Sequence, residues 1–431
     1  MEKPEIRPDP VLPCVVVAGQ LCLDIFPDLD SVPEGQFLQY FKPGHMVEAG
    51  KASFAVGGAV ANTGLALARL GVPARLMARM GVDPFADIVD GIFQRYAKAR
   101  MAEHGSLILR ANFIVQAGTP TAYTLIISPP GVDRIFLHCP GASDTFAADD
   151  VDFSALEEAA IFHFGYPCVM RQFYRAGGRE LVELFHRARK TGVTTSLDMT
   201  PPNVSGEAGQ ADWVAILGAA LPHVDIFLPS IEEILFLLRR RTYDVLQESA
   251  GSASSSPRLV HPSGVPKGDS GGLAHLVTPE LLHNLSSQLL DMGVKIAGFK
   301  LGERGFYLRT AGKKALENLG RGRPAVLADW ADQTLWAPAF KVKVAGTTGA
   351  GDSAIAGLLS GLLRGLGPRQ ALSAAVAVGA CNVEAADGQS GLRSWEDTLA
   401  RVAAGWSRHA LNLPPAEWEW DEQTGVWVGK A

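Results

Sequence analysis

The chain has 431 residues, of which 47% are apolar and 19% are charged, a composition typical of a globular protein with a substantial core. Its net charge of −6 excludes a general electrostatic attraction to nucleic acids or anionic membranes. Five scattered cysteines without CxxC spacing argue against a disulfide framework and a structural zinc site. Because no convincing secretion signal or membrane span is found either, we expect a cytoplasmic protein without nucleic-acid or membrane partners.

The first part of the chain predicts one strand, one helix and a set of short strands. β-Branched residues at 15–17 predict a strand, and helical spacing of apolar residues follows at 57–70. Alternating segments within 106–145 predict antiparallel strands. We expect segments 28–55 and 106–140 to form a small lid.

From about residue 150, strands and helices alternate. Strands are predicted at 161–164, 194–197, 226–228 and 296–299. This repetition predicts an α/β fold with a mostly parallel central sheet flanked by helices on both faces and a small β-strand lid. Residues that can bind ligands follow several strands, at the sheet edge where ligands gather: Asp24, Asp198, Ser230 with Glu233, Gly302 and Asp352.

Two segments differ from the main domain, which we expect to span residues 11–410. Residues 248–275 are rich in serine, proline and glycine, and such a composition predicts a flexible insertion. Residues 411–431 form an aromatic and acidic C-terminal extension, which we expect to pack against the main domain.

The most informative stretch is Gly346-Thr347-Thr348-Gly349-Ala350-Gly351-Asp352, which precedes an apolar segment with helical spacing. Small residues allow a tight turn, and a helix start offers unpaired N–H groups and partial positive charge to an anion. Asp352 adds a carboxylate that can take a proton from a hydroxyl while charge develops on a transferring group. The combination favours phosphoryl transfer to an alcohol. The alternative is an ordinary helix start with Asp352 as a dipole partner.

Several motifs, in matching order, resemble those of the ribokinase-like, or PfkB, carbohydrate kinase family. The similarity covers about residues 14–400. The motifs are Gly57-Gly58-Ala59-Val60-Ala61-Asn62-Thr63-Gly64-Leu65-Ala66 with Arg69-Leu70-Gly71, Gly81-Val82-Asp83-Pro84-Phe85, Gly141-Ala142-Ser143, Leu301-Gly302-Glu303-Arg304-Gly305, Thr347-Thr348-Gly349-Ala350-Gly351-Asp352 and Ala385-Ala386-Asp387-Gly388.

The resemblance implies ATP as phosphate donor, Mg²⁺, and a small sugar or nucleoside as acceptor. It implies Asp352 as catalytic base and the amides of Gly349, Ala350 and Gly351 as anion hole. The further implied residues are Asp24, Gly57, Gly58 and Asn62 for the acceptor, Lys300, Gly302, Gly305 and Thr348 for the nucleotide, and Glu233, through water, for the metal.

Some of these residues have structural alternatives. In the alternative interpretation, Asp24 is a turn residue at a strand end and Asn62 caps a helix. For Lys300 and Arg304 a solvated surface position is the favoured interpretation. His163, Phe164 and Tyr166 follow the same pattern: they line the acceptor pocket or, as the favoured alternative, belong to the core or rim.

The chain also departs from the family pattern. Gly346 stands where the family usually has an aspartate beside a monovalent-cation site, which leaves K⁺ activation uncertain. Ser230 replaces the asparagine of the family's Asn-x-x-Glu, and Ala354 replaces a bulky aromatic residue. Cys22 and Ala59 replace polar residues of ribokinase, which disfavours ribose as the acceptor.

The sequence therefore favours ATP-dependent phosphorylation of a sugar hydroxyl, with the Asp352 carboxylate facing a cleft. A nucleoside kinase of the same family is one alternative. A kinase-like protein that binds without turnover is another, suggested by Gly346 and Ser230. Many relatives dimerise through the lid, so a homodimer is a further expectation.

Overall fold

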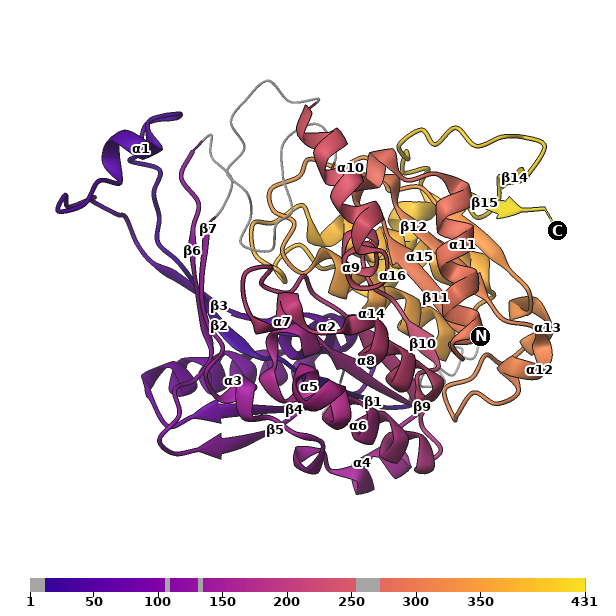
Figure 1. Cartoon of the computed structure of the whole chain (residues 1–431), viewed down its shortest axis with the longest axis horizontal. Coiled ribbons are helices and arrows are strands. Elements are labelled where there is room, and N and C mark those ends of the chain that lie inside the picture. The colour runs from indigo at the N-terminus through magenta and orange to yellow at the C-terminus, as the bar shows by residue number, and fades with distance from the viewer. Residues whose placement is uncertain (1–11, 105–108, 131–134, 253–271, 431) are drawn as a thin grey trace, which may run out of the picture.

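The computed structural model describes residues 12–104, 109–130, 135–252 and 272–430. Eleven strands form one large sheet in the order β14-β15-β13-β12-β11-β10-β9-β8-β1-β4-β5 (Figure 1). Neighbouring strands from β5 to β11 pair in parallel, and the remainder pair antiparallel. The strands are β1 (Val15–Gly19), β4 (Ala74–Gly81), β5 (Leu109–Gln116), β8 (Ile161–Gly165), β9 (Thr194–Asp198), β10 (Ile226–Phe227), β11 (Ile296–Lys300), β12 (Phe306–Thr310), β13 (Thr334–Ala337), β14 (Trp418–Asp421) and β15 (Val426–Gly429).

Helices cover both faces of the large sheet, as the alternation of strands and helices predicts. On β1, Val15 and Val17 belong to a core with α2, α14 and α15, whereas Val16 and Ala18 belong to a second core with α6, α8, α9 and α11. The helices are α1 (Phe37–Tyr40), α2 (Gly58–Arg69), α3 (Pro84–His104), α4 (Phe153–Glu158), α5 (Arg171–Tyr174), α6 (Arg179–Lys190), α7 (Glu207–Gln210), α8 (Trp213–Ala220), α9 (Ile231–Leu238), α10 (Arg240–Ser252), α11 (Pro279–Asp291), α12 (Lys313–Leu316), α13 (Leu327–Trp330), α14 (Ala350–Leu363), α15 (Pro368–Asn382) and α16 (Trp395–Ala403). Within the described segments, no helix combines the length and apolarity needed to cross a membrane.

Two glycines bring α14 and α15 unusually close together. A Cβ added at Gly357 would lie 2.8 Å from Ala375 Cα, and one added at Gly361 would lie 3.0 Å from Ala371 Cα. Real Cβ atoms essentially never approach as closely as at Gly357, so the packing requires glycine there, and at Gly361 a Cβ would press on α15. The close packing fixes the position of α14, whose first turn carries Asp352.

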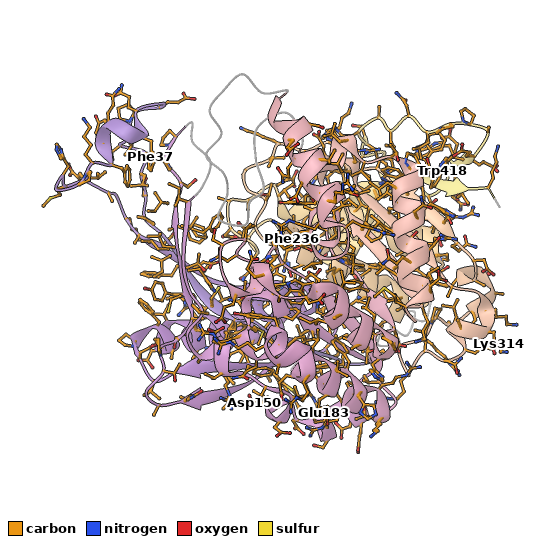
Figure 2. The ribbon with its side chains drawn as sticks, viewed as in Figure 1. Phe37, Asp150, Glu183, Phe236, Lys314 and Trp418 are labelled. Carbon is orange, nitrogen blue, oxygen red and sulfur yellow. The ribbon has the colours of Figure 1, made fainter. Side chains whose placement is uncertain are left out.

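Four further strands form the lid, in the order β3-β2-β6-β7. They are β2 (Cys22–Phe26), β3 (Ser53–Gly57), β6 (Tyr123–Ile127) and β7 (Ile135–Cys139). The lid extends away from the large sheet and carries α1 at its far end, where Phe37 lies (Figures 1 and 2). A lid of strands is therefore present, and β2, which precedes the expected segment 28–55, is one of its central strands.

The assignment of the whole segment 106–140 to the lid is wrong in one part. Strand β5 lies at the edge of the large sheet and pairs in parallel with β4. The reason is the 21-residue α3 between them, which is long enough to return the chain for a parallel crossover. Phe113 on β5 packs on Phe93 of this helix, with ring centroids 5.0 Å apart.

Both ends of the expected insertion at 248–275 have helical structure. α10 extends to Ser252, and a 3-10 helix begins at Leu273. The serine-rich centre of the expected insertion, residues 253–271, lies outside the described residues.

The C-terminal extension joins the large sheet instead of packing against it as a separate piece. Strand β15 pairs antiparallel with β13, and β14 pairs with β15. Trp418 on β14 is 6% exposed, with its ring centroid 6.2 Å from that of Trp336 and 6.4 Å from that of Tyr307. The hairpin thus completes an aromatic core at one end of the sheet.

We expect Trp418→Ala to lower the free energy of unfolding by about 3–5 kcal/mol, because it removes a buried tryptophan from this core. Trp420→Ala on the same strand is the matched control and should cost clearly less, because Trp420 is only half-buried. Urea unfolding followed by circular dichroism measures both. Equal midpoints for the two variants would contradict a structural role of the hairpin.

Candidate active site

The first turn of α14 places Asp352 at the centre of the candidate site. Gly349 precedes the helix with φ 70°, a left-handed conformation that glycine adopts without steric cost. Asp352 is 3% exposed. Its Oδ2 accepts hydrogen bonds from the Tyr166 hydroxyl at 2.7 Å and from Asn62 Nδ2 at 3.1 Å, and its Oδ1 accepts one from Thr63 Oγ1 at 3.3 Å. The sequence predicts a carboxylate that faces a cleft, whereas the structure buries it among polar side chains.

Asn62 joins the two glycine motifs, which are almost 300 residues apart in the chain. A Cβ added at Gly349 would lie 3.3 Å from Asn62 Cγ, and one added at Gly388 would lie 3.1 Å from Asn62 Oδ1. Asn62 is not the N-cap of α2, because that position belongs to Gly57. Its Oδ1 is buried without a hydrogen-bond partner among the described residues. An unpaired buried acceptor is costly, which marks this oxygen as one available to a ligand.

Lys300, the last residue of β11, lies beside the Asp352 turn. Its Nζ is 2.5 Å from Asp198 Oδ1 at the end of β9, and its side chain is 13% exposed. The stem passes over the glycine turn, since a Cβ added at Gly351 would lie 3.1 Å from Lys300 Cδ. The favoured interpretation of Lys300 as a solvated surface residue is therefore wrong. Asp198 Oδ2 is buried without a partner among the described residues.

Burial and mutual repulsion raise the pKa values of the carboxyl groups in this cluster. Burial and the charge of Asp198 raise the pKa of Asp352 to about 7, although Lys300 and the hydrogen bonds from Tyr166 and Asn62 oppose the shift. Burial lowers the pKa of Lys300, but the neighbouring carboxylates outweigh it and raise that pKa. A carboxyl group with a pKa near neutrality is suited to accept a proton at physiological pH.

Glu233 combines a structural contact with a place in this cluster. Ser230 caps α9: its Oγ accepts a hydrogen bond from the Glu233 amide at 3.2 Å, and Glu233 Oε2 accepts one from the Ser230 amide at 2.7 Å. Burial raises the pKa of Glu233 to about 8, with Lys300 lowering it and Asp198 raising it. In the described part of the chain, no group of three or more His, Cys, Asp or Glu residues is arranged to hold a metal ion.

The predicted acceptor residues of the N-terminal motif gather where the lid meets α2. Asp24 is 6% exposed on β2 and accepts a hydrogen bond from Cys22 Sγ at 3.3 Å. A Cβ at Gly57 would overlap the Asp24 carboxylate, and one at Gly58, with φ 86°, would overlap Gln20. Asp24 lies within a strand and is not a turn residue. The buried Gln20 is a neighbour of this motif that sequence reasoning missed.

The residues predicted to bind the nucleotide differ from one another in their surroundings. Gly302 has an open position with φ 58°, and Thr348 lies half-buried directly before Gly349. Gly305 is a glycine for packing, because a Cβ there would overlap the backbone of Ala337. Arg304 donates to the carbonyl oxygens of residues 274 and 277 and lies over the Trp336 ring, so its solvated interpretation is wrong too.

His163 and Phe164 lie in β8, and Tyr166 follows it directly. The structure places the first two in the core. Phe164 is fully buried, and His163 is buried with Nδ1 2.9 Å from Ser196 Oγ. Tyr166 differs, because its hydroxyl contacts Asp352. The available signal was its position directly after a parallel strand, at the edge where ligands gather.

Tyr166 also has an uncommon backbone conformation. Its φ of 71° and ψ of 41° lie in the left-handed region, which costs a bulky residue about 1–3 kcal/mol. The conformation is held by Pro167, which begins a 3-10 helix, and by a hydrogen bond from the Tyr166 amide to the Asp198 carbonyl oxygen at 3.2 Å. The strain therefore serves to direct the side chain toward the site.

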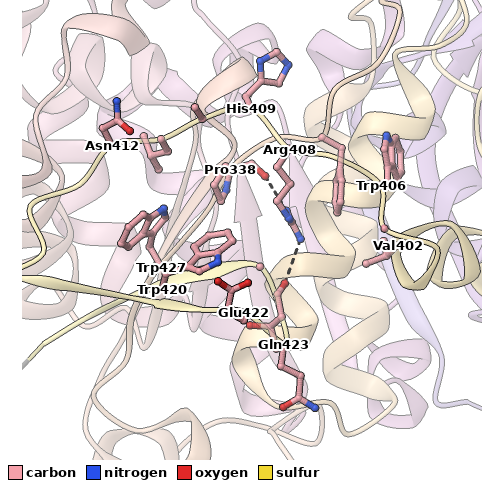
Figure 3. A pocket seen from close by; sticks show the side chains of 16 residues that line it. Pro338, Val402, Trp406, Arg408, His409, Asn412, Trp420, Glu422, Gln423 and Trp427 are labelled. Atoms are coloured by element: carbon pink, nitrogen blue, oxygen red, sulfur yellow. Dashed lines mark hydrogen bonds between the residues drawn. The ribbon is translucent and has the colours of Figure 1, made fainter.

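A separate cavity of about 630 Å³ lies between the C-terminal hairpin and the main body. Arg408 lies at its centre, with Trp420 and Trp427 on one side and Trp406 on the other (Figure 3). The Arg408 guanidinium donates to the carbonyl oxygens of residues 338 and 424 and to a serine hydroxyl. Through these bonds Arg408 joins the hairpin to the main body. None of the residues that line the cavity belongs to the Asp352 cluster.

Comparison with known proteins decides the family. The family model described as pfkB family carbohydrate kinase matches residues 15–260 and 272–395, which is most of the chain. The chain belongs to the pfkB family of carbohydrate kinases. The predicted family resemblance is thereby confirmed.

Individual relatives of this pfkB-family chain are distant. It is 24% identical to probable fructokinase-4 of Arabidopsis thaliana over 229 residues, which make up 52% of this chain and 61% of that protein. It is 21% identical to an uncharacterized sugar kinase of Archaeoglobus fulgidus over 301 residues, 70% of this chain and 87% of that protein. The chain thus spans about three fifths of the length of that fructokinase.

Solved structures share the fold of this pfkB-family chain. Ribokinase from Thermotoga maritima aligns with a TM-score of 0.60 and 19% identity, covering 91% of this chain and 99% of that one. Fructokinase from Xylella fastidiosa with bound ATP aligns with a TM-score of 0.62 and 16% identity, covering 91% and 98%. The fold is ribokinase-like, as predicted.

The structure explains why this pfkB-family chain has glycine at position 346. A Cβ added at Gly346 would lie 2.6 Å from the Ala386 carbonyl oxygen and 2.9 Å from Ala386 Cα. The 385–388 loop therefore leaves no room for the aspartate usual in the family. K⁺ dependence stays an open expectation.

The cluster predicts a pH dependence for a reaction in which Asp352 accepts a proton. If Asp352 must lose its proton to act, kcat/KM should rise with pH and inflect near 7. Asp198→Asn removes a charge that raises the pKa of Asp352, so the inflection should move to lower pH. Lys300→Met removes a charge that lowers this pKa, so the inflection should move to higher pH.

The matched control for these shifts is Asp225→Asn. Asp225 forms another buried ion pair, with Lys295 at 2.7 Å, outside the Asp352 cluster. The inflection should stay in place for this variant. Shifts of the same sign in Asp198→Asn and Lys300→Met would contradict the electrostatic account.

Proposed function

We propose that the protein transfers the γ-phosphoryl group of ATP to a hydroxyl of a small sugar. One observation carries the proposal: the Asp352 carboxylate, with a pKa raised to about 7, lies at the start of α14, beside Gly351 and the Lys300 side chain. Family membership and the relatives named fructokinase and sugar kinase support a sugar as acceptor.

In the proposed reaction, Asp352 orients the acceptor hydroxyl and takes its proton as the oxygen attacks the γ-phosphorus. The bond from phosphorus to the bridging oxygen breaks, and ADP leaves. Because the transition state is loose, positioning and charge stabilisation supply most of the catalysis. The amides of Gly349, Ala350 and Gly351, at the start of α14, remain the proposed donors for the transferring group, although the Ala350 amide also donates to the Thr347 carbonyl oxygen at 3.3 Å.

The side chains around Lys300 fit a nucleotide with its metal. The Lys300 side chain lies over the glycine turn at Gly351, and its ammonium would contact a phosphate. Mg²⁺ prefers carboxylate oxygens and water, and Glu233 and the unpartnered Asp198 Oδ2 offer such oxygens. When bound, the ion supplies neutralisation of phosphate charge. Gly302 and Thr348 remain proposed nucleotide contacts.

The acceptor would bind between the lid and α2. Asp24 presents a carboxylate and Asn62 an unpartnered Oδ1, and both can accept hydrogen bonds from sugar hydroxyls. Gly57 and Gly58 let the Asp24 carboxylate and Gln20 lie directly against the backbone of this corner. A nucleoside also carries ribose hydroxyls, so a nucleoside kinase is the second candidate. A binding protein without turnover is the third candidate, and the retained Asp352 with the intact Gly349-Ala350-Gly351 turn argues against it.

We expect Asp352→Asn to lower kcat by at least about 10³-fold, because it removes the proton acceptor without changing the shape of the side chain. ADP release is measured with ATP, Mg²⁺ and a panel of sugars and nucleosides. The wild-type protein identifies the acceptor, and the same assay gives the loss of kcat in the variant. The control is Asp291→Asn at the exposed end of α11, which should match wild type. Turnover in Asp352→Asn near the wild-type rate would refute the assignment of the base.

A homodimer through the lid is also proposed. Phe54 on the edge strand β3 and Leu137 on the edge strand β7 are 47% and 53% exposed, and a partner lid would cover them. Leu137→Glu should then convert a dimer to a monomer in sedimentation velocity, with Val245→Glu, on the exposed face of α10, as control. A wild-type monomer at all concentrations would contradict this proposal.

A further inference from the structure

The Tyr166 hydroxyl occupies the position that an acceptor hydroxyl needs. It donates a hydrogen bond of 2.7 Å to Asp352 Oδ2, the shortest of the three bonds that this carboxylate accepts. An acceptor hydroxyl that gives its proton to Asp352 must form the same kind of bond. Since Asp352 is only 3% exposed, the two hydroxyls compete for the same carboxylate.

The structure holds the phenol in this place by an uncommon backbone. Tyr166 has φ 71° and follows Gly165, whose missing side chain lets Ala59 of α2 pack against the end of β8. Tyr166 as a whole is half-buried, whereas Phe164, two residues before it, is fully buried. The phenol hydroxyl contacts the buried Asp352 carboxylate directly.

The chemistry of the pair favours a lasting hydrogen bond in the absence of a ligand. Burial and then the charge of Asp352 raise the pKa of Tyr166, so the phenol keeps its proton and remains a donor. In return its hydrogen bond lowers the pKa of Asp352. A bond to a charged group of this kind shifts an equilibrium by roughly ten- to a hundredfold.

We propose that Tyr166 is an internal substitute for the acceptor hydroxyl, which occupies the Asp352 carboxylate until an acceptor displaces it. This inference rests on the proposed kinase function and assigns a regulation of the same site. Its effect is to keep water away from the base. Without it, a water oxygen would attack the γ-phosphorus, Asp352 would take the proton of water, and the bond to the bridging oxygen would break to release ADP and phosphate.

The test is the release of ADP and phosphate from ATP and Mg²⁺ without any acceptor, which requires no knowledge of the natural sugar. Tyr166→Phe keeps the ring and removes the hydroxyl, and we expect acceptor-independent hydrolysis to rise by roughly ten- to a hundredfold. The inflection of its pH profile should move to higher pH, because a bond that lowers the pKa of Asp352 is lost. Once an acceptor is known, its KM should fall.

Three further variants make the result decisive. Tyr174→Phe removes a phenol hydroxyl from a ring that packs on Trp213, and its hydrolysis should match wild type. Tyr166→Gly relieves the left-handed strain, so it should fold well and also hydrolyse ATP faster. Tyr166→Phe combined with Asp352→Asn should abolish the gain.

The outcomes separate the two proposals. Acceptor phosphorylation that depends on Asp352, with unchanged hydrolysis and KM in Tyr166→Phe and Tyr166→Gly, would overturn the role of Tyr166 alone. A fall in kcat without a gain in hydrolysis would make Tyr166 a positioning group for the transfer step and would also overturn it. Absence of ATP turnover in wild type, Tyr166→Phe and Tyr166→Gly alike would reject both the kinase function and the inference.

Discussion

The hydrogen bond from Asn62 to Asp352 is the contact on which the candidate site depends. It joins the middle of α2 to the first turn of α14, and both helices pack on the same face of the large sheet. Glycine at two neighbouring turns leaves room for the contact, since a Cβ at position 349 or 388 would press on Asn62 and force it to shift. The close packing of α14 on α15 at Gly357 holds the other partner in place. A charge-bearing site is thus positioned by residues without side chains.

A second constraint is the excess of acidic over basic groups around Asp352. Asp198, Glu233 and Asp352 face a single buried lysine, so the cluster carries excess negative charge when all are ionised. Burial makes this unfavourable, which is why pKa values rise toward neutrality. A site with spare carboxylate oxygens and too few cations is suited to receive a metal together with a phosphate chain. The left-handed backbone of Tyr166 is also energetically unfavourable, and strained conformations of this kind are retained mainly at functional sites.

Much of the fold followed from the order of motifs, because strands and helices alternate regularly after residue 150. Strand β5 was misassigned because an edge strand with mostly exposed residues gives no signal of its parallel partner. Site residues could be predicted from the sequence where a motif fixes the local backbone, as at Gly349 and Asp352. It was missed where a side chain's direction depends on packing: Lys300 turns inward to Asp198, and Tyr166 reaches Asp352 only through a left-handed backbone. Sequence spacing does not encode either direction.

The C-terminal hairpin has a consequence beyond the aromatic core that it completes. Without it, β13 would present open backbone donors and acceptors to solvent, whereas with it the outermost strand is the short β14. That strand carries Glu419 and Asp421, and the latter is bound to Arg369 at 3.0 Å. Short acidic edges resist pairing with another chain. The hairpin therefore closes this edge of the large sheet to pairing with another chain, and proteolytic trimming there should reduce solubility before it affects the chemistry.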